Sequence, residues 1–209
     1  MEISLSRMHF PVTTLGPGNR IGIWMQGCSL RCKGCLSPDT WSVKNNGITV
    51  EVLVEQMKDW LPFADGITIS GGEPFEQPEA LHSLLVAIRK ISQGDILVYS
   101  GYEWHKIESQ VSAMKGLIDA LISEPFQVKA TQTKILRGSD NQQLHMLTAL
   151  GRKRFEQYER TMTTKDKVLD LSVDETGRIF LTGIPQRDDM QRLRLLLEQQ
   201  EQPLKQLKK

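Results

Sequence analysis

The sequence predicts an α/β protein in which parallel strands alternate with helices. Short runs rich in β-branched and other apolar residues, at 20–27, 66–70 and 95–101, each end at or beside glycine. The segments between them repeat apolar residues every three or four positions, as helices that cover a sheet do. Strands and helices in this order form right-handed crossovers, and the sheet that results is parallel.

The first expected strand leads directly into a group of cysteines. In residues 20–27 apolar side chains alternate with less apolar ones, which is the period of a strand, and Gly27 ends the run. A helix follows at 50–61, and Pro62 stops it. The apolar stripe of this helix consists of Val50, Leu53, Val54, Met57, Trp60 and Leu61.

The second expected strand, at 66–70, breaks into two consecutive glycines. Pro78 suits the first turn of the next helix, and Gly94 closes that helix after an apolar stripe that runs from 81 to 91. A third strand is expected at 95–101. The remaining elements of this part of the chain are a helix at about 103–115, a strand at 117–123 and a candidate fifth strand at 133–136.

The pattern changes after about residue 151. Two strand-like runs flank residues 174–177, whose glycine suits a tight link, so a β-hairpin is expected. Asp188 and Asp189 suit the first turn of a final helix. We therefore expect a core of residues 1–150 and an extension of residues 151–209. One face of the final helix carries Met190, Leu193, Leu196 and Leu197.

The composition is that of an ordinary globular protein. The 209 residues are 39% hydrophobic and 24% charged, with a net charge of +1. This balance gives no reason to expect broad binding to nucleic acid or to membranes. The basic clusters at 152–154 and 205–209 are interpreted as solvated surface. No secretory h-region and no window of about 20 apolar residues is found, so we expect a cytoplasmic protein.

Three cysteines, Cys28, Cys32 and Cys35, lie within eight residues at C-x3-C-x2-C spacing. Their odd number and the expected compartment argue against a disulfide framework. Iron–sulfur clusters are held by cysteine thiolates, usually four of them. Three ligands without a fourth cysteine leave one iron open to an external ligand, which is typical of a catalytic cluster rather than an electron carrier.

Two other interpretations of the cysteines stay open at this point. A structural zinc ion would need a histidine as its fourth ligand. None of the histidines lies at a diagnostic spacing from the cysteines; they are His9, His82, His105 and His145. The cysteines could also remain free thiols.

The sequence Ser70-Gly71-Gly72-Glu73-Pro74 is the second candidate feature. Two glycines at a strand end let a ligand approach the backbone, because no Cβ stands in the way. Glu73 adds a carboxylate, and Pro74 fixes the turn that follows. The alternative is that these residues only make a tight turn between strand and helix.

These features should meet at one edge of the sheet. Cys28, the pair Gly71-Gly72 and the pair Ser100-Gly101 each follow an expected strand. In parallel α/β sheets the active site lies at the carboxyl ends of the strands. We therefore place the candidate site at that edge.

The two motifs together resemble the radical S-adenosylmethionine superfamily. Residues 11–147, about two-thirds of the chain, are similar to the activating enzymes of glycyl radical enzymes, and most of all to the activases of anaerobic ribonucleotide reductase. The residues that carry this resemblance are Gly16–Arg20, Gly27-Cys28, Gly34-Cys35, Thr40-Trp41, Ile69–Pro74, Tyr99–Tyr102 and Leu136–Gln142.

The resemblance implies a fold, a cofactor and a reaction. The fold is an open partial barrel of parallel strands with helices outside, followed by a C-terminal hairpin and helix. The three cysteines would hold a 4Fe–4S cluster, and the amino and carboxylate groups of S-adenosylmethionine would chelate the fourth iron. One electron then yields methionine and a 5′-deoxyadenosyl radical, which removes a hydrogen atom from a substrate.

The resemblance also implies partners and further site residues. The substrate would be a glycine of a partner protein, and the electron donor a protein such as flavodoxin; neither nucleic acid nor a membrane is expected. Gly72, with Glu73 nearby, would hold the methionine amino end, and Gly34 and Leu36 would contact the cofactor beside the cluster. The remaining residues assigned to the cofactor site are Gly71 and Ser100.

The chain also departs from the pattern of these families. Gly34 stands where much of the superfamily has an aromatic residue. A glycine at this position fits the reductase-activase branch. Arg137 is expected to pair with a carboxylate or to form a purely structural ion pair. Residues 152–209 have no counterpart in the short reductase activases, so they would dock a different target, cover the open side of the sheet or mediate dimerisation.

Two alternative functions remain at this point. One is the same radical chemistry on a peptide or a small molecule. The other is a non-catalytic iron–sulfur or zinc module used for binding or electron transfer.

Overall fold

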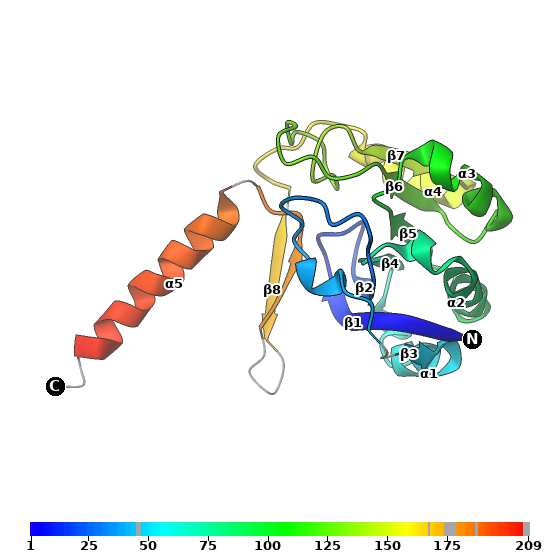
Figure 1. The fold of residues 1–209 in the computed structure, drawn as a ribbon, viewed down its shortest axis with the longest axis horizontal. Coiled ribbons are helices and arrows are strands. Elements are labelled where there is room, and N and C mark those ends of the chain that lie inside the picture. Colours follow the sequence, from blue (N-terminus) through cyan, green and yellow to red (C-terminus); the bar gives the residue numbers. More distant parts are fainter. Residues whose placement is uncertain (45–46, 167, 174–178, 187, 207–209) are drawn as a thin grey trace.

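The computed structural model describes residues 1–44, 47–166, 168–173, 179–186 and 188–206. Its centre is a seven-stranded sheet in the order β3-β1-β2-β4-β5-β6-β7 (Figure 1). The four central strands β2, β4, β5 and β6 are parallel, and antiparallel strands complete both edges. The strands are β1 Glu2–Val12, β2 Arg20–Met25, β3 Gly47–Thr49, β4 Gly66–Gly71, β5 Asp95–Tyr99, β6 Ala120–Ser123 and β7 Gln143–Met146.

The sheet confirms the predicted α/β class with parallel strands, but its edges differ from the prediction. Residues 133–136 form no strand, only a single bridge from Lys134 to Thr161. The last edge strand is instead β7, which is antiparallel to β6. The sheet order does not show whether the strands form the expected partial barrel, which stays a prediction.

Strand β1 was missed because its apolar alternation changes phase. The buried Ile3 and the partly buried Leu5 are odd-numbered, whereas Met8 and Phe10, which pack against the same cluster, are even-numbered. The pairing with β2 shifts between Leu5 and Arg7, which is a bulge or similar irregularity. An extra residue in one strand moves the side chains that follow to the opposite face. A strict period of two therefore never extends along the whole strand.

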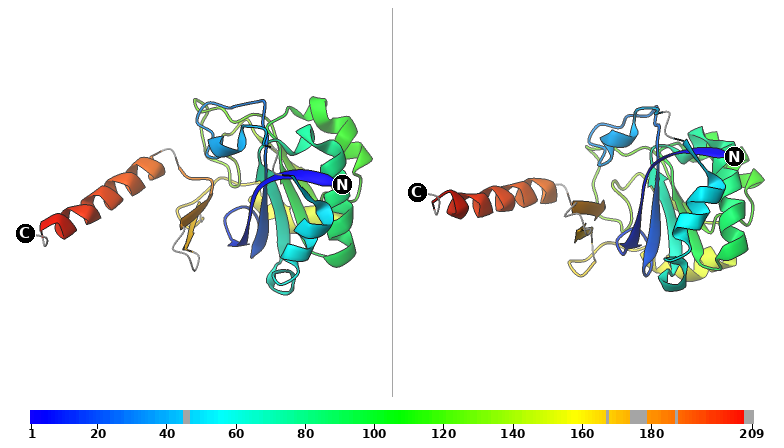
Figure 2. Two further views of the ribbon diagram at one scale, coloured as in Figure 1. Left: turned by 60° about the horizontal axis from the view of Figure 1, so that its bottom comes forward. Right: turned by 90° about the horizontal axis from the view of Figure 1, so that it is seen from below.

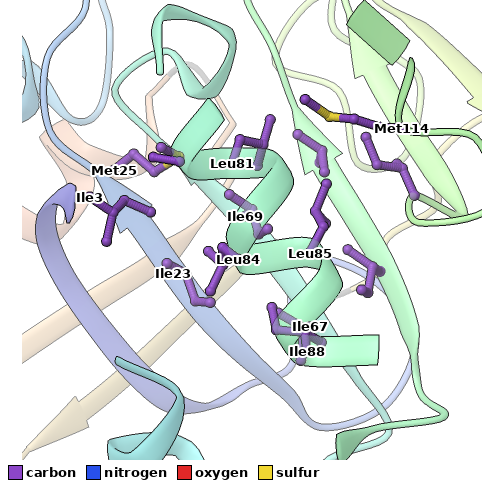
Figure 3. Packing of buried hydrophobic residues seen from close by; sticks show 14 of the residues in the cluster. Ile3, Ile23, Met25, Ile67, Ile69, Leu81, Leu84, Leu85, Ile88 and Met114 are labelled. Atoms are coloured by element: carbon purple, nitrogen blue, oxygen red, sulfur yellow. The ribbon is translucent and has the colours of Figure 1, made fainter. Parts of the chain in front are cut away.

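Helices α1, α2 and α3 pack on one face of the sheet and lie close to their predicted positions. Thr49 caps α1 by accepting from the Val52 N–H, and Pro78 occupies the first turn of α2 as expected. The α2 residues Leu81, Leu84 and Ile88 pack on strand residues of this face (Figure 3). The helices are α1 Val50–Met57, α2 Pro78–Ile91, α3 Trp104–Ala113, α4 Ala149–Phe155 and α5 Asp189–Gln206.

A second, smaller core lies on the opposite face of β5 and β6. Leu97 and Ile122 point to this side and pack with Phe155, at the end of α4, which is fully buried. Helix α4 was not predicted. Tyr158 and Met162, which follow α4, pack against the same cluster. Residues up to Met162 thus pack against the sheet, although the core was expected to end at residue 150.

The amino ends of the strands surround a buried ion cluster. The Arg20 Nη2 lies 2.7 Å from the Asp95 Oδ1, and both side chains are fully buried. Arg154 places its Nε 2.9 Å from the other oxygen, Asp95 Oδ2. The interpretation of residues 152–154 as solvated surface is therefore wrong for Arg154. The Gly16–Arg20 motif has a structural explanation, since a Cβ at Gly16 would lie 2.7 Å from the Arg20 Nε.

The predicted C-terminal hairpin and helix are present. Strands β8 Leu169–Val173 and β9 Ile179–Gly183 form a separate antiparallel pair, and the predicted link at 174–177 lies outside the described residues. The polar face of the hairpin faces the body, where Asp170 Oδ2 accepts from the Thr13 N–H at 2.6 Å. Helix α5 extends away from the sheet (Figures 1 and 2). None of the described helices is long and apolar enough to cross a membrane.

Candidate iron–sulfur and cofactor site

Three loops meet at the carboxyl edge of the parallel strands, as predicted. The Gly72 N–H donates to the Met25 carbonyl at 2.8 Å, and the Glu73 N–H donates to the Gly27 carbonyl at 2.8 Å. The Ser100 hydroxyl donates to Glu73 Oε1 at 2.9 Å. The cysteine loop after β2, the glycine turn after β4 and the loop after β5 are therefore bonded to one another.

The cysteine loop is closed by two main-chain hydrogen bonds. The Gly27 N–H donates to the Thr40 carbonyl at 2.8 Å, and the Cys28 N–H donates to the Trp41 carbonyl at 3.1 Å. This closure explains why Thr40 and Trp41 stand with the cysteines in the motif. It keeps all three cysteines, each of which is half-buried and unbonded to another cysteine, within one compact loop.

Main-chain N–H groups face the thiols. Burial raises the pKa of Cys28 and of Cys32, and N–H groups oppose the rise, from Arg31 and Leu30 at Cys28 and from Phe126 at Cys32. The Ser37 N–H donates to the Cys35 Sγ at 3.4 Å. Hydrogen bonds to sulfur are one of the features by which proteins support and tune iron–sulfur clusters. The donors around the three sulfurs therefore suit thiolate ligands.

Two of the histidines considered as a fourth zinc ligand make other contacts. Among the described residues, no three His, Cys, Asp or Glu side chains converge on one metal position. A cluster does not need such convergence, because each cysteine binds a separate iron. His9 pairs with Ser172, and His145 stacks on Trp104 at a centroid distance of 4.0 Å, so neither is placed as a zinc ligand.

Glu73 is fully buried, and hydrogen bonds within the chain satisfy both of its oxygens. Oε1 accepts from the Phe75 N–H at 3.0 Å and from the Ser100 hydroxyl, and Oε2 accepts from the Gly101 N–H at 2.7 Å. Burial raises the pKa of Glu73 to about 7, although these donors oppose the rise. The carboxyl group thus joins the ends of β4 and β5. Its expected role near the methionine amino end stays a prediction.

Close packing alone requires the two glycines. A Cβ at Gly72 would overlap the carbonyl oxygen of Gly27. Gly71 has φ +97°, and a Cβ there would lie 2.6 Å from the Met25 nitrogen. Both positions therefore need glycine to bring the β4 turn against the cysteine loop, whether or not a ligand also contacts them.

Gly34 and Leu36 are the residues immediately before and after Cys35 in the sequence. Gly34 has φ +83°, and a Cβ there would be only 3.3 Å from the ring of Phe126. Leu36 is 53% exposed, which leaves it available to a ligand. Phe126 comes from the loop after β6, and sequence reasoning missed it because that loop has no periodic pattern.

A second group missed by sequence reasoning holds the start of the cysteine loop. Glu76 Oε1 accepts from the Ser29 N–H at 2.9 Å and from the Ser29 hydroxyl at 2.5 Å. The Tyr102 hydroxyl donates to the same oxygen at 3.2 Å. Glu76 follows the Gly-Gly-Glu-Pro motif closely, and this proximity was the only signal in the sequence that could have identified it.

Arg137 forms a structural ion pair, one of the two expected outcomes. Its side chain is buried and pairs with Glu159, which belongs to the segment after α4. The neighbouring Leu136 carbonyl accepts from the Tyr99 hydroxyl at 3.1 Å. This part of the motif therefore ties the loop after β6 to β5 and to residues beyond 150.

Comparison with known proteins gives consistent matches. A family described as "4Fe-4S single cluster domain" matches residues 14–145. The anaerobic ribonucleoside-triphosphate reductase-activating protein of Haemophilus influenzae is 31% identical over 147 residues, 66% of this chain and 94% of that protein. The protein of the same name from Enterobacteria phage T4 is 28% identical over 134 residues, 62% of this chain and 85% of that protein.

Two further matches cover only part of the other protein. The pyruvate formate-lyase-activating enzyme of Streptococcus mutans is 30% identical over 135 residues, 60% of this chain and 51% of that enzyme. The crystal structure of QueE from Escherichia coli matches 48% of this chain and 53% of that chain, with 18% identity and a TM-score of 0.42. The likeness to QueE is too small to support an argument about fold or function.

Proposed function

This chain belongs to the family of 4Fe-4S single cluster domain proteins, and from that premise we propose that it is a radical S-adenosylmethionine enzyme that activates a glycyl radical enzyme. One observation carries the proposal: the loop with three cysteines and the Gly-Gly-Glu turn are bonded together at the carboxyl edge of a parallel sheet. Two relatives that are matched over 94% and 85% of their own length are named as anaerobic ribonucleoside-triphosphate reductase-activating proteins.

Cys28, Cys32 and Cys35 would hold a 4Fe–4S cluster and leave one iron open. When bound, the cluster and S-adenosylmethionine supply the electron transfer that yields methionine and a 5′-deoxyadenosyl radical. The chain's contribution is to hold and shield this chemistry. We assign S-adenosylmethionine to a site formed by residues of the cysteine loop, the β4 turn and the β5 loop: Gly34, Leu36, Gly71, Gly72, Glu73 and Ser100.

The arrangement of the loops supports this assignment. Glu73 joins the β4 turn to the β5 loop, and Glu76 joins the same turn to Ser29 at the start of the cysteine loop. Any ligand between these loops would therefore meet main-chain groups whose positions are fixed before binding. Such preorganisation limits the ordering that binding must impose.

The names of the relatives as activating proteins support a protein substrate. We propose that the substrate is a glycine in a partner protein, that the electron donor is a small redox protein such as a flavodoxin, and that the enzyme works in the cytoplasm. We also propose that residues after about 166 serve target choice or assembly. The catalytic unit would then extend to about residue 166, because Phe155 and Met162 pack with the sheet.

Anaerobic reconstitution tests the function. We expect roughly four iron and four sulfide per chain, a reduced cluster whose electron paramagnetic resonance signal changes when S-adenosylmethionine is added, and formation of 5′-deoxyadenosine with dithionite. Addition of a candidate glycyl radical partner should then produce a glycyl radical signal. Stoichiometric zinc without iron uptake would refute the proposal. Cleavage of S-adenosylmethionine without any protein radical would favour a peptide or small-molecule substrate.

A further inference from the structure

The segment 124–127, directly after β6, lies against the cysteine loop. The ring of Phe126 is half-buried, and its Cε1 would lie 3.3 Å from a Cβ at Gly34. The main-chain N–H of Phe126 faces the Cys32 thiol. One residue from outside the cysteine loop therefore touches it at two places between the second and third cysteines.

Three side chains of the 136–142 motif hold this segment in place. The Gln142 Nε2 donates to the Glu124 carbonyl at 3.1 Å, and the Asn141 Nδ2 donates to the Pro125 carbonyl at 2.9 Å. On the other side of Phe126, the Gln127 N–H donates to the Ser139 hydroxyl at 3.1 Å. Residues before and after Phe126 are thus fixed by neighbouring residues of one motif.

The same motif also packs against the ring. A Cβ at Gly138 would lie 3.0 Å from the Phe126 Cδ2, so the ring lies between two glycines, Gly34 and Gly138. The Gly138 N–H donates to the Gln142 Oε1 at 2.8 Å, which fixes this second glycine. The Glu124 N–H donates to the Tyr102 carbonyl at 2.9 Å and connects the segment to the loop after β5.

The cysteine loop needs such support. Arg31 has φ +45° and Gly34 has φ +83°, so the backbone between the cysteines twice adopts a conformation that L-residues rarely take. An aromatic ring against the second of these turns restricts its movement and covers it from solvent. Groups that surround the ligands of a metal centre control both ligand orientation and access of water.

We propose that Phe126 is a positioning residue of the cluster site, held against the cysteine loop by Ser139, Asn141 and Gln142, and that its ring shields the loop between Cys32 and Cys35. This inference rests on the proposed function, because it assumes that the three cysteines hold the cluster. According to this inference, the Ser139–Gln142 part of the motif serves to position Phe126.

The test compares the reconstituted cluster in Phe126→Ala, Phe126→Tyr and wild-type protein. Phe126→Ala keeps the main-chain N–H, so its effect reports on the ring. We expect it to lose iron to a ferrous chelator about tenfold faster than wild type. Its cluster midpoint potential should rise, because water would stabilise the reduced cluster. Phe126→Tyr should restore both values, and Phe63→Ala, at a phenylalanine that is 70% exposed on η2 (Leu61–Phe63), should change neither.

A second variant tests whether the motif acts through Phe126. Asn141→Ala removes the bond to the Pro125 carbonyl and should reproduce part of the faster iron loss. Combined with Phe126→Ala it should add little, because Asn141 is proposed to act by placing a ring that Phe126→Ala has already removed. If Phe126→Ala does not fold, as judged by circular dichroism of the apoprotein, Phe126→Leu takes its place in the comparison.

The outcomes separate this inference from the proposed function. Iron loss and midpoint potential in Phe126→Ala equal to those of wild type would overturn the inference alone, and so would full additivity with Asn141→Ala. A stable cluster that fails to cleave S-adenosylmethionine would overturn the proposed activity and leave the role of Phe126 intact. Wild-type protein that takes up no cluster would overturn both.

Discussion

Glu73 shows how one residue can connect several loops. Its buried carboxyl group accepts from the buried Phe75 and Ser100 and from the partly exposed Gly101. In a buried site the loss of one such partner costs more than the same loss at the surface, because water cannot replace it. The residues of the site are therefore bound to one another before any ligand arrives.

The raised pKa of Glu73 predicts a pH dependence of stability. Burial raises this pKa from 4.5 to about 7, so between these values the folded chain keeps a proton that the unfolded chain has lost. Stability of the apoprotein should then fall as pH rises through this window, by on the order of 3 kcal/mol from this group. Urea unfolding at several pH values measures the slope.

Two variants identify the source of this slope. Glu73→Gln should lower stability at low pH, yet remove most of the decline between pH 4.5 and 7. Glu79→Gln, at an exposed carboxylate in the first turn of α2, should leave the decline unchanged. An equal slope in wild type and Glu73→Gln would assign the titration to another group.

Gly72 offers a second prediction at this scale. Gly72→Ala would push a Cβ into the Gly27 carbonyl and displace the cysteine loop, so iron uptake and S-adenosylmethionine binding should fall together. Gly47→Ala is the control, because Gly47, like Gly72, has no positive φ, and a Cβ there would make only ordinary contacts, the nearest 3.4 Å from the Glu2 Oε2. If Gly72→Ala keeps a full cluster and loses only S-adenosylmethionine affinity, the glycine serves the ligand rather than the packing.

At the scale of elements, the amino ends of β2 and β5 are joined by charge. Asp95 starts β5 and lies between Arg20 of β2 and Arg154 of α4. Arg20 also donates to the Thr68 hydroxyl at 2.6 Å and to the Pro17 carbonyl at 3.1 Å. The loop before β2, the three parallel strands β2, β4 and β5, and α4 therefore depend on one ion cluster at the end of the sheet opposite the candidate site.

Asp95→Asn should be strongly destabilising. It would leave the fully buried Arg20 without its counter-ion, at an expected cost of about 3 kcal/mol in free energy of unfolding. Asp39→Asn, which breaks a half-exposed pair with Arg7, should cost about 1 kcal/mol or less. Urea denaturation of the two apoproteins makes the comparison, and similar midpoints would contradict the importance given to the buried cluster.

At the scale of the whole molecule, the chain after α4 divides into two parts. Residues up to Met162 pack into the second core. The hairpin contacts the body through polar groups such as Asp170 and Ser172, whereas Leu171 and Ile179 on its other face are 58% and 63% exposed. Only the first part is expected to matter for folding of the sheet.

Two truncations test this division. A chain that ends at Leu150 loses the fully buried Phe155 and should be insoluble or poorly folded. A chain that ends at Asp166 should fold, hold a cluster and still form 5′-deoxyadenosine with dithionite, but fail to activate a partner protein. Circular dichroism and product analysis distinguish the two. A folded Asp166 truncation that cannot cleave S-adenosylmethionine would place the hairpin in the catalytic unit.

The features that sequence reasoning identified are local ones. The spacing of three cysteines, a glycine pair at a strand end and the apolar stripes of α1 and α2 can all be recognised within a few turns of chain. Three of the four parallel strands, β2, β4 and β5, were recognised from buried runs that end at or beside glycine, and β6 from the apolar run at 117–123. The meeting of the loops after β2, β4 and β5 could be predicted from these strands, because parallel strands place their carboxyl ends at one edge of the sheet.

The features that only the tertiary structure decided depend on contacts between distant residues. The bulge in β1, the choice of β7 over residues 133–136 as edge strand, and the pairing of Arg154 with Asp95 have no local signature. Phe126 lies beside Gly34 in a segment to which Asn141 and Gln142, far along the chain, are hydrogen-bonded. The spacing of the cysteines, read with the family resemblance, thus predicted the ligands of the proposed cluster. Long-range packing determined what surrounds them, because burial and hydrogen-bond partners exist only once the sheet has formed.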